Sequence, residues 1–129
     1  MENRYLFRGK TIRGDWVRGL LASKDNNWYI GNKVGRPLAF EIRPESICQC
    51  TGLKDMNGNL IWENDIVAYW NTYSTESGYA EADCIGRVVW DAETISFQVT
   101  NRLSAESYEV LGECSVIGNI FDNSELLEV

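Results

Sequence analysis

Short apolar runs alternate with polar turn signals along the whole chain. The runs are rich in aromatic and β-branched residues and often repeat with a period of two, which predicts strands rather than helices. The expected strands cover residues 5–8, 15–21, 28–30, 38–42, 46–51, 60–62, 66–70, 85–90, 95–99, 108–110 and 116–120. Consecutive runs separated by short turns are expected to pair as hairpins.

The clearest turn covers residues 55–59, where glycine and asparagine suit positive φ. A second tight turn is expected at residues 63–65. There Asn64 suits the left-handed region, and Asp65 is placed to accept a backbone N–H. Residues 72–83 are polar, and we expect a mobile loop.

The fold class expected from this pattern is all-β and mainly antiparallel, a small barrel or sandwich of short strands. Helical structure should be limited to short turns near the C-terminus, where Asn123 could serve as the N-cap. A length of 129 residues fits a single domain over residues 1–129.

Charge is divided unevenly along the chain. Residues 1–43 hold nine of the 12 basic and four of the 19 acidic residues, whereas residues 44–129 carry a net charge of −12. Either the charges mix on one folded surface, or a basic and an acidic face survive and pair between subunits. The total of −7 disfavours general nucleic-acid binding. A local basic patch stays open, built from Arg4, Arg8, Lys10, Arg13 and Arg18.

The sequence offers few candidate residues for catalysis, and we expect no catalytic residue, cofactor or metal. The chain has no histidine, which removes the commonest general base near neutral pH. Four cysteines could bind zinc, but only Cys48 and Cys50 are close in sequence, and their spacing is unusual for zinc. Reduced core cysteines are favoured over zinc or a reactive thiol. The other two cysteines are Cys84 and Cys114.

Two acid pairs could serve glycoside hydrolysis or bind Mg²⁺, namely Glu63 with Asp65 and Asp91 with Glu93. Both pairs fall in predicted turns, where acids commonly cap backbone groups. Five tryptophans could stack bases or sugars, although we expect most of them in the core. They are Trp16, Trp28, Trp62, Trp70 and Trp90.

No apolar stretch is long enough to span a bilayer, and residues 1–8 hold no apolar run of signal-peptide length. We therefore expect a cytoplasmic protein without membrane contact, in which the cysteines are reduced.

The central block, residues 51–67, resembles the signature of the YopX-like proteins encoded by phages and prophages. That signature reads T-G-L-x-D-x-x-G-x-x-I-[YF]-E-G-D-I-V. Its structural turn residues correspond here to Thr51, Gly52, Asp55, Gly58, Glu63 and Asp65. Four flanking blocks also resemble the family, at residues 5–9, 14–19, 86–91 and 116–127.

Two departures from the family pattern are informative. Asn64 stands where the family usually has glycine, which supports positive φ there. Cys48 and Cys50 stand where relatives tend to carry small or aromatic residues, which weakens the zinc interpretation further.

The resemblance implies a phage or prophage origin, a bacterial cytoplasmic location and homo-oligomerisation, and it supplies no catalytic residues. Our leading hypothesis is a non-enzymatic, self-associating module that binds a phage or host protein. A nucleic-acid accessory using the N-terminal basic residues with Trp16 or Trp28 is the first alternative. A carboxylate-based enzyme using Glu63, Asp65 or Asp91 is the second.

Overall fold

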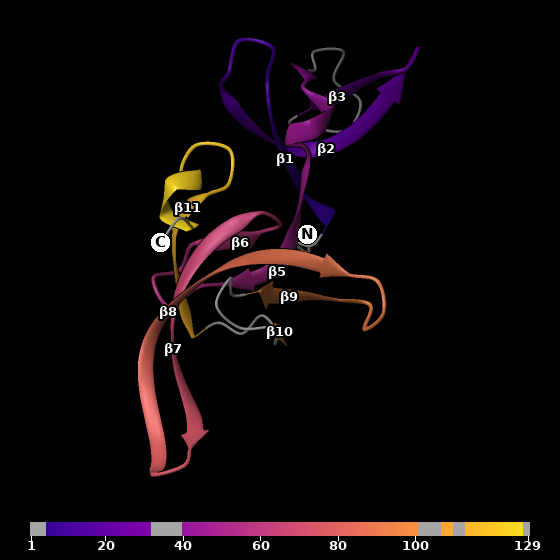
Figure 1. Cartoon of the computed structure of the whole chain (residues 1–129). Helices are drawn as coiled ribbons and strands as arrows, with labels where there is room; N and C mark the ends of the chain where they lie inside the picture. The colour runs from indigo at the N-terminus through magenta and orange to yellow at the C-terminus, as the bar shows by residue number, and fades with distance from the viewer. Residues whose placement is uncertain (1–4, 32–39, 101–106, 110–112, 128–129) are drawn as a thin grey trace. The chain divides into compact units, whose positions relative to one another are not determined.

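The chain forms two compact units, Met1–Gly52 and Leu53–Val129. A computed structural model describes residues 5–31, 40–100, 107–109 and 113–127 (Figure 1). The described elements are antiparallel strands with only short 3₁₀ turns, which confirms the all-β prediction. Within the described residues, no helix has the length and apolar character needed to cross a membrane.

The first unit is built on antiparallel strands in the order β4-β3-β2-β1-β5. Its elements are β1 (Phe7–Lys10), β2 (Trp16–Lys24), β3 (Asn27–Gly31), β4 (Phe40–Ile42), the 3₁₀ turn η2 (Pro44–Ser46) and β5 (Cys48–Lys54). The hairpin expected between the first two strands is confirmed, with Arg8 opposite Arg18 and Lys10 opposite Trp16. Strand β1 runs to Lys10, two residues beyond the strand expected at residues 5–8.

The sheet of the first unit curls until β4 meets the end of β1. A bridge joins Thr11 to Ile42, and the N–H of Arg43 donates to the carbonyl of Lys10 at 2.8 Å. Ile42 is buried, and a Cβ on Gly9 would collide with its side chain. The missing side chain at Gly9 therefore lets the strands close into a small barrel.

The second unit is built on a five-stranded antiparallel sheet with the order β10-β9-β8-β7-β11. Its elements are β6 (Leu60–Trp62), β7 (Asp65–Thr75), β8 (Gly78–Asp91), β9 (Ser96–Thr100), β10 (Ser107–Glu109), β11 (Cys114–Asn119) and the 3₁₀ turn η3 (Ser124–Leu127). The core of this unit consists of Ile61, Val67, Val88, Val99 and Cys114.

Strands β7 and β8 continue together well past the rest of their sheet. The described pairing of β11 with β7 ends at Tyr69, and that of β9 with β8 ends at Arg87. Pairing of β7 with β8 nevertheless runs on from Trp70 opposite Asp83 to the end at Gly78. Residues 70–83, which we call the arm, therefore form a two-stranded ribbon that projects from the sheet (Figure 1).

The mobile loop expected at residues 72–83 is thus wrong. Its threonines, tyrosines and small residues suit extended structure, and Gly78 has a φ of +129° beside the two-residue connection. The helical turn near the C-terminus is present. The Asn123 side chain, expected to cap it, accepts a hydrogen bond from a residue before the turn instead. Asn123 Oδ1 accepts the N–H of Asn119 at 3.2 Å.

Candidate functional site

The turn at residues 55–59 is organised by one buried carboxylate. Asp55 is only 5% exposed, and its Oδ1 accepts the N–H groups of Asn57 at 3.0 Å and Asn59 at 2.8 Å. Its Oδ2 accepts the N–H of Val116 in β11 at 2.9 Å. Burial raises the pKa of Asp55, but these three backbone donors outweigh it and hold the pKa below its ordinary value.

The remaining contacts of this turn are also structural. The N–H of Met56 donates to the carbonyl of Cys114, so the turn pairs with the edge of β11 much as a strand would. Gly52 and Gly58 both have a φ of +84°, which favours glycine over any residue with a Cβ. Thr51 lies half-buried in β5.

The second signature turn confirms both predictions made for it. Asn64 has a φ of +70°, and its Oδ1 accepts two hydrogen bonds from Arg87, at 2.8 Å from Nη2 and 3.2 Å from Nε. Asp65 is 1% exposed, and its Oδ2 accepts the N–H of Trp62 at 2.7 Å. Glu63, just before Asn64 in the chain, is half-buried.

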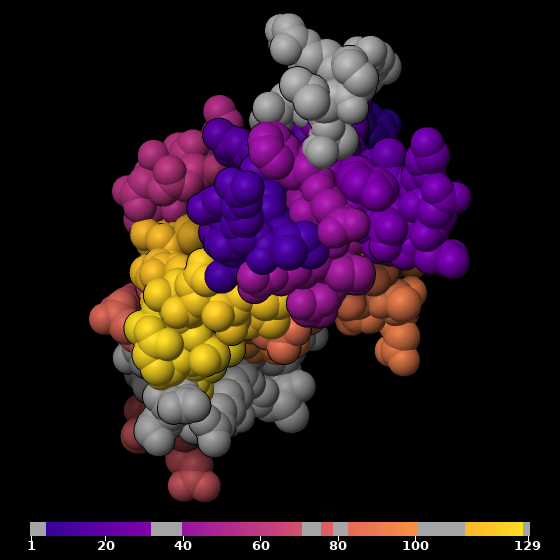
Figure 2. Space-filling model, turned by 90° about the horizontal axis from the view of Figure 1, so that it is seen from above, coloured from indigo at the N-terminus to yellow at the C-terminus, as the bar shows by residue number. Residues whose placement is uncertain are grey.

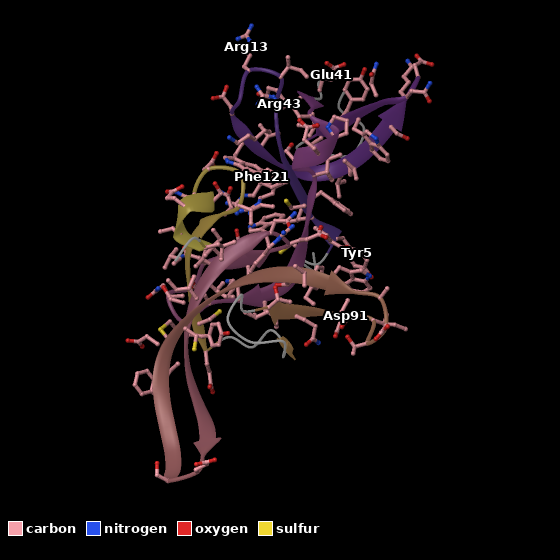
Figure 3. The ribbon with its side chains drawn as sticks, in the orientation of Figure 1. Tyr5, Arg13, Glu41, Arg43, Asp91 and Phe121 are labelled. Carbon is pink, nitrogen blue, oxygen red and sulfur yellow. The ribbon has the colours of Figure 1, made fainter. Side chains whose placement is uncertain are left out.

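The two acid pairs do not converge on one centre. Asp91 Oδ1 accepts the N–H of Glu93 at 2.9 Å, so this acid caps the turn between β8 and β9 (Figure 3). Asp65 has the same kind of role in its own turn. Among the described residues, no three histidine, cysteine, aspartate or glutamate side chains are grouped so that they could hold a metal ion.

All four cysteines are free thiols. Cys48, Cys50 and Cys114 are buried, and Cys84 is half-buried. Burial raises the pKa of Cys114, and the nearby charges of Asp55 and Asp65 raise it further. The thiol of Cys114 is therefore protonated near neutral pH, which is the opposite of what a nucleophilic cysteine needs.

The expectation that most tryptophans lie in the core is wrong. Only Trp62 is buried, whereas Trp28, Trp70 and Trp90 are 37%, 57% and 47% exposed. The buried cluster of the second unit is made of isoleucine, valine and cysteine side chains instead. Surface tryptophans are therefore available for contacts with a partner.

Two hollows open on the first unit. One, of about 420 Å³, lies at the end of the β2–β3 hairpin and is lined by Ser23, Lys24, Asp25, Asn26 and Trp28. The other, of about 610 Å³, lies beside the β1–β2 turn and is lined by Thr11, Ile12, Arg13, Asp15, Val17, Phe40 and Glu41. Both linings mix cations with carboxylates, so neither selects an anion or a cation by charge alone. Arg13 itself points away from the barrel at the tip of its turn (Figure 3).

A basic strip follows one face of β1 and β2. Alternate residues of a strand share a face, and the register places Arg8 opposite Arg18 and Lys10 opposite Trp16. Lys24 continues this face along β2. Neither strand contains an acidic residue. We call Arg8, Lys10, Arg18 and Lys24 the basic strip.

Exposure differs along the basic strip. Arg18 and Lys24 are exposed, and Arg8 and Lys10 are half-buried. The hairpin end that carries Lys24 lies open at the surface, coloured violet in the space-filling view (Figure 2). Of the patch predicted from sequence, Arg13 lies in the neighbouring turn, and Arg4 lies outside the described residues.

Two cations of the strip lie over one aromatic ring, that of Trp16. The Arg8 guanidinium carbon lies 4.9 Å from the centroid of the Trp16 ring, and Lys10 Nζ lies 5.5 Å from it. Cation–π contacts of this kind occupy ring surface. Trp16 is therefore less suited to stacking on a base than the exposed Trp28.

The division of charge follows the division of the fold. Residues 1–52 contain nine basic and five acidic side chains, a net charge of +4, and residues 53–129 contain three basic and 14 acidic ones, a net charge of −11. The basic and acidic segments thus belong to different compact units.

Neither the full basic strip nor the arm was predicted from the sequence. Lys24 was outside the predicted patch, although its even spacing from Arg18 along one strand was a usable signal. The corresponding signal for the arm is the short segment Glu76-Ser77-Gly78, which stands between two runs that contain tyrosine.

Comparison with known families gives one finding. The family model described as YopX protein matches residues 15–128, which is most of the chain. No curated protein matches.

Proposed function

This chain belongs to the YopX protein family, and from that premise we propose that it is a non-enzymatic, self-associating module that binds or assembles proteins. The observation that carries the proposal is the charge of the two units, +4 for residues 1–52 and −11 for residues 53–129. Opposite charge on separate units favours contacts between copies, because each copy carries both complementary surfaces.

The wider setting is part of the same proposal. The resemblance to phage and prophage proteins supports an origin in a mobile element and a location in the bacterial cytoplasm. Free thiols at all four cysteines suit that reducing compartment. A phage or host protein is the partner class that follows from this setting.

Light scattering after size exclusion, at low and high ionic strength, tests the self-association. We expect assemblies larger than one chain at about 0.05 M salt and smaller ones at about 0.5 M salt, because salt screens charge pairing between exposed surfaces. A single chain at both ionic strengths and at every protein concentration would rule the proposal out.

A nucleic-acid accessory is the second candidate, and the basic strip is the observation that favours it. Phosphate groups bind exposed cations such as Arg18 and Lys24. Two observations oppose it, the net charge of −7 and the cations that lie over Trp16. Gel shift at low salt with single- and double-stranded DNA and RNA decides the matter, since absence of a shift there removes this candidate.

The carboxylate-based enzyme has less support. Asp65 and Asp91 each use a carboxylate oxygen to hold the backbone of a turn. An acid–base pair for glycoside hydrolysis needs two carboxyl groups facing one substrate. The non-enzymatic assignment is therefore our proposal, and hydrolysis of a panel of glycosides by the purified protein would overturn it.

A further inference from the structure

The arm is a ribbon of two strands that no third described strand joins. Beyond Tyr69 and Arg87 neither edge of the β7–β8 pair is bonded to β9 or β11. A two-stranded ribbon by itself is only marginally stable in water, and its free edges can pair with another chain. A partner that covers such a projecting ribbon would therefore stabilise it.

The base of the arm presents apolar surface to solvent. Trp70 is 57% exposed and Ile85 is 41% exposed. Ile85 lies opposite Ala68, two residues before Trp70, so the two exposed side chains share one face of the ribbon as diagonal neighbours. Tryptophan is among the residues that contribute most to protein interfaces.

The charge of the arm narrows the choice of partner. Residues 70–83 carry Glu76, Glu81 and Asp83 and contain no lysine or arginine, a net charge of −3. Two arms would therefore repel each other. A basic surface with some apolar area is the complement that the arm requires.

The same chain carries such a surface, and we propose that the arm of one copy binds the basic strip of a second copy. The strip has four cations on one face of β1 and β2, and neither strand has an acid. Leu20 and Ala22 lie between Arg18 and Lys24 on that face and supply apolar area for Trp70. This inference rests on the self-association proposed above and names the two surfaces that meet.

The contact joins two different surfaces, the arm of one copy and the basic strip of another. Each copy gives one arm and receives one, so a reciprocal exchange closes a two-fold dimer, and one-way contacts build a ring or an open chain. Both surfaces are charged, so association must weaken as salt concentration rises. Pairing between two acidic arms would instead strengthen as salt screens their repulsion.

Charge reversal on the arm tests this contact. The arm variant combines Glu76→Lys with Asp83→Lys, both at exposed positions. The control combines Glu93→Lys with Glu125→Lys, exposed acids of the same unit that lie off the arm. Both variants change the net charge equally. At low salt, sedimentation should show association weakened about tenfold or more for the arm variant and little changed for the control.

A complementary pair of variants identifies the receiving surface. The strip variant combines Arg18→Glu with Lys24→Glu, and it should fail to associate by itself. Mixed in equal amounts, the arm and strip variants restore opposite charges at the altered positions, so association should recover toward the wild-type level. This restoration also shows that both variants are folded. Trp70→Ala should weaken association without changing its dependence on salt.

Several results would overturn the inference. They are an arm variant that associates like wild type, a control that loses as much as the arm variant, a mixture that stays dissociated, and an oligonucleotide that binds the strip while the chain remains a monomer. In the first three cases a self-associating wild type leaves the proposed function standing and places the contact elsewhere. A wild type that is monomeric under all conditions removes both proposals.

Discussion

Asp55 Oδ2 accepts a hydrogen bond at 2.9 Å from the N–H of Val116, which lies 61 residues further along the chain. The same carboxylate accepts the N–H groups of Asn57 and Asn59. The Asp55 side chain thus stabilises the turn at residues 55–59 and also bonds this turn to the edge of β11. The signature position of the family is therefore explained by backbone hydrogen bonding.

Replacing this carboxylate should destabilise the second unit. Asp55→Ala leaves three N–H groups without their acceptor, and we expect a loss of about 3 kcal/mol in the free energy of unfolding by urea. Asp55→Asn keeps one acceptor oxygen and should lose less. Glu125→Ala, at an exposed position, is the control and should change stability by no more than about 0.5 kcal/mol. A loss below about 1 kcal/mol for Asp55→Ala would contradict this role.

The lowered pKa of Asp55 predicts a specific dependence on pH. The folded state binds this proton less tightly than the unfolded state does, whose pKa is near the ordinary value of 3.8. The stabilisation is therefore complete above that value and is lost as pH falls through the folded-state pKa. The stability difference between wild type and Asp55→Asn should narrow as pH falls from about 5 to below the ordinary value of 3.8. A difference that stays constant over this range would show that the charge is not what stabilises the turn.

Asn64 should be energetically coupled to Arg87. Its Oδ1 accepts two hydrogen bonds from the guanidinium, while its backbone holds a φ of +70°. Asn64→Gly relieves the backbone but loses both bonds. A double-mutant cycle of Asn64→Gly with Arg87→Met should give a coupling of about 1 to 2 kcal/mol. Additive effects of the two substitutions would show that asparagine is present only for its backbone conformation.

Ile95 should be a site where substitution stabilises the protein. It has a φ of +52°, unfavourable for a β-branched residue, and its side chain is 75% exposed. Ile95→Asn or Ile95→Gly should raise the free energy of unfolding by about 1 kcal/mol. Ile95→Val retains the branched Cβ and serves as the control, with no gain expected. Equal stability of all variants would argue against strain at this turn.

Local features were predictable from sequence, and features that depend on pairing were not. The positive φ of Asn64 and Gly58 follows from residue type in a tight turn. The basic strip needs the register that sets Arg8 opposite Arg18, and the contact between Asp55 and Val116 needs the whole sheet. No local pattern encodes either.

The arm was missed for a different reason. Period-two alternation of apolar and polar residues is a signal of one buried face. Residues 72–83 lie outside the described buried cluster of their sheet and are mostly polar or small in type, so the signal is weak. The tryptophans were mispredicted in the opposite direction. Their large apolar side chains predicted burial, but Trp70 lies exposed at the base of the arm.

The two-residue connection between β7 and β8 sets an expected order of folding for the second unit. Only Glu76 and Ser77 separate the strands, and hairpins with such short loops form in about 1 to 10 μs. The bond between Asp55 and Val116 joins residues 61 positions apart, which costs more chain entropy and comes later. The ribbon that projects from the finished sheet is therefore expected to be the first pair of strands to form, and β9 and β11 then add to its base.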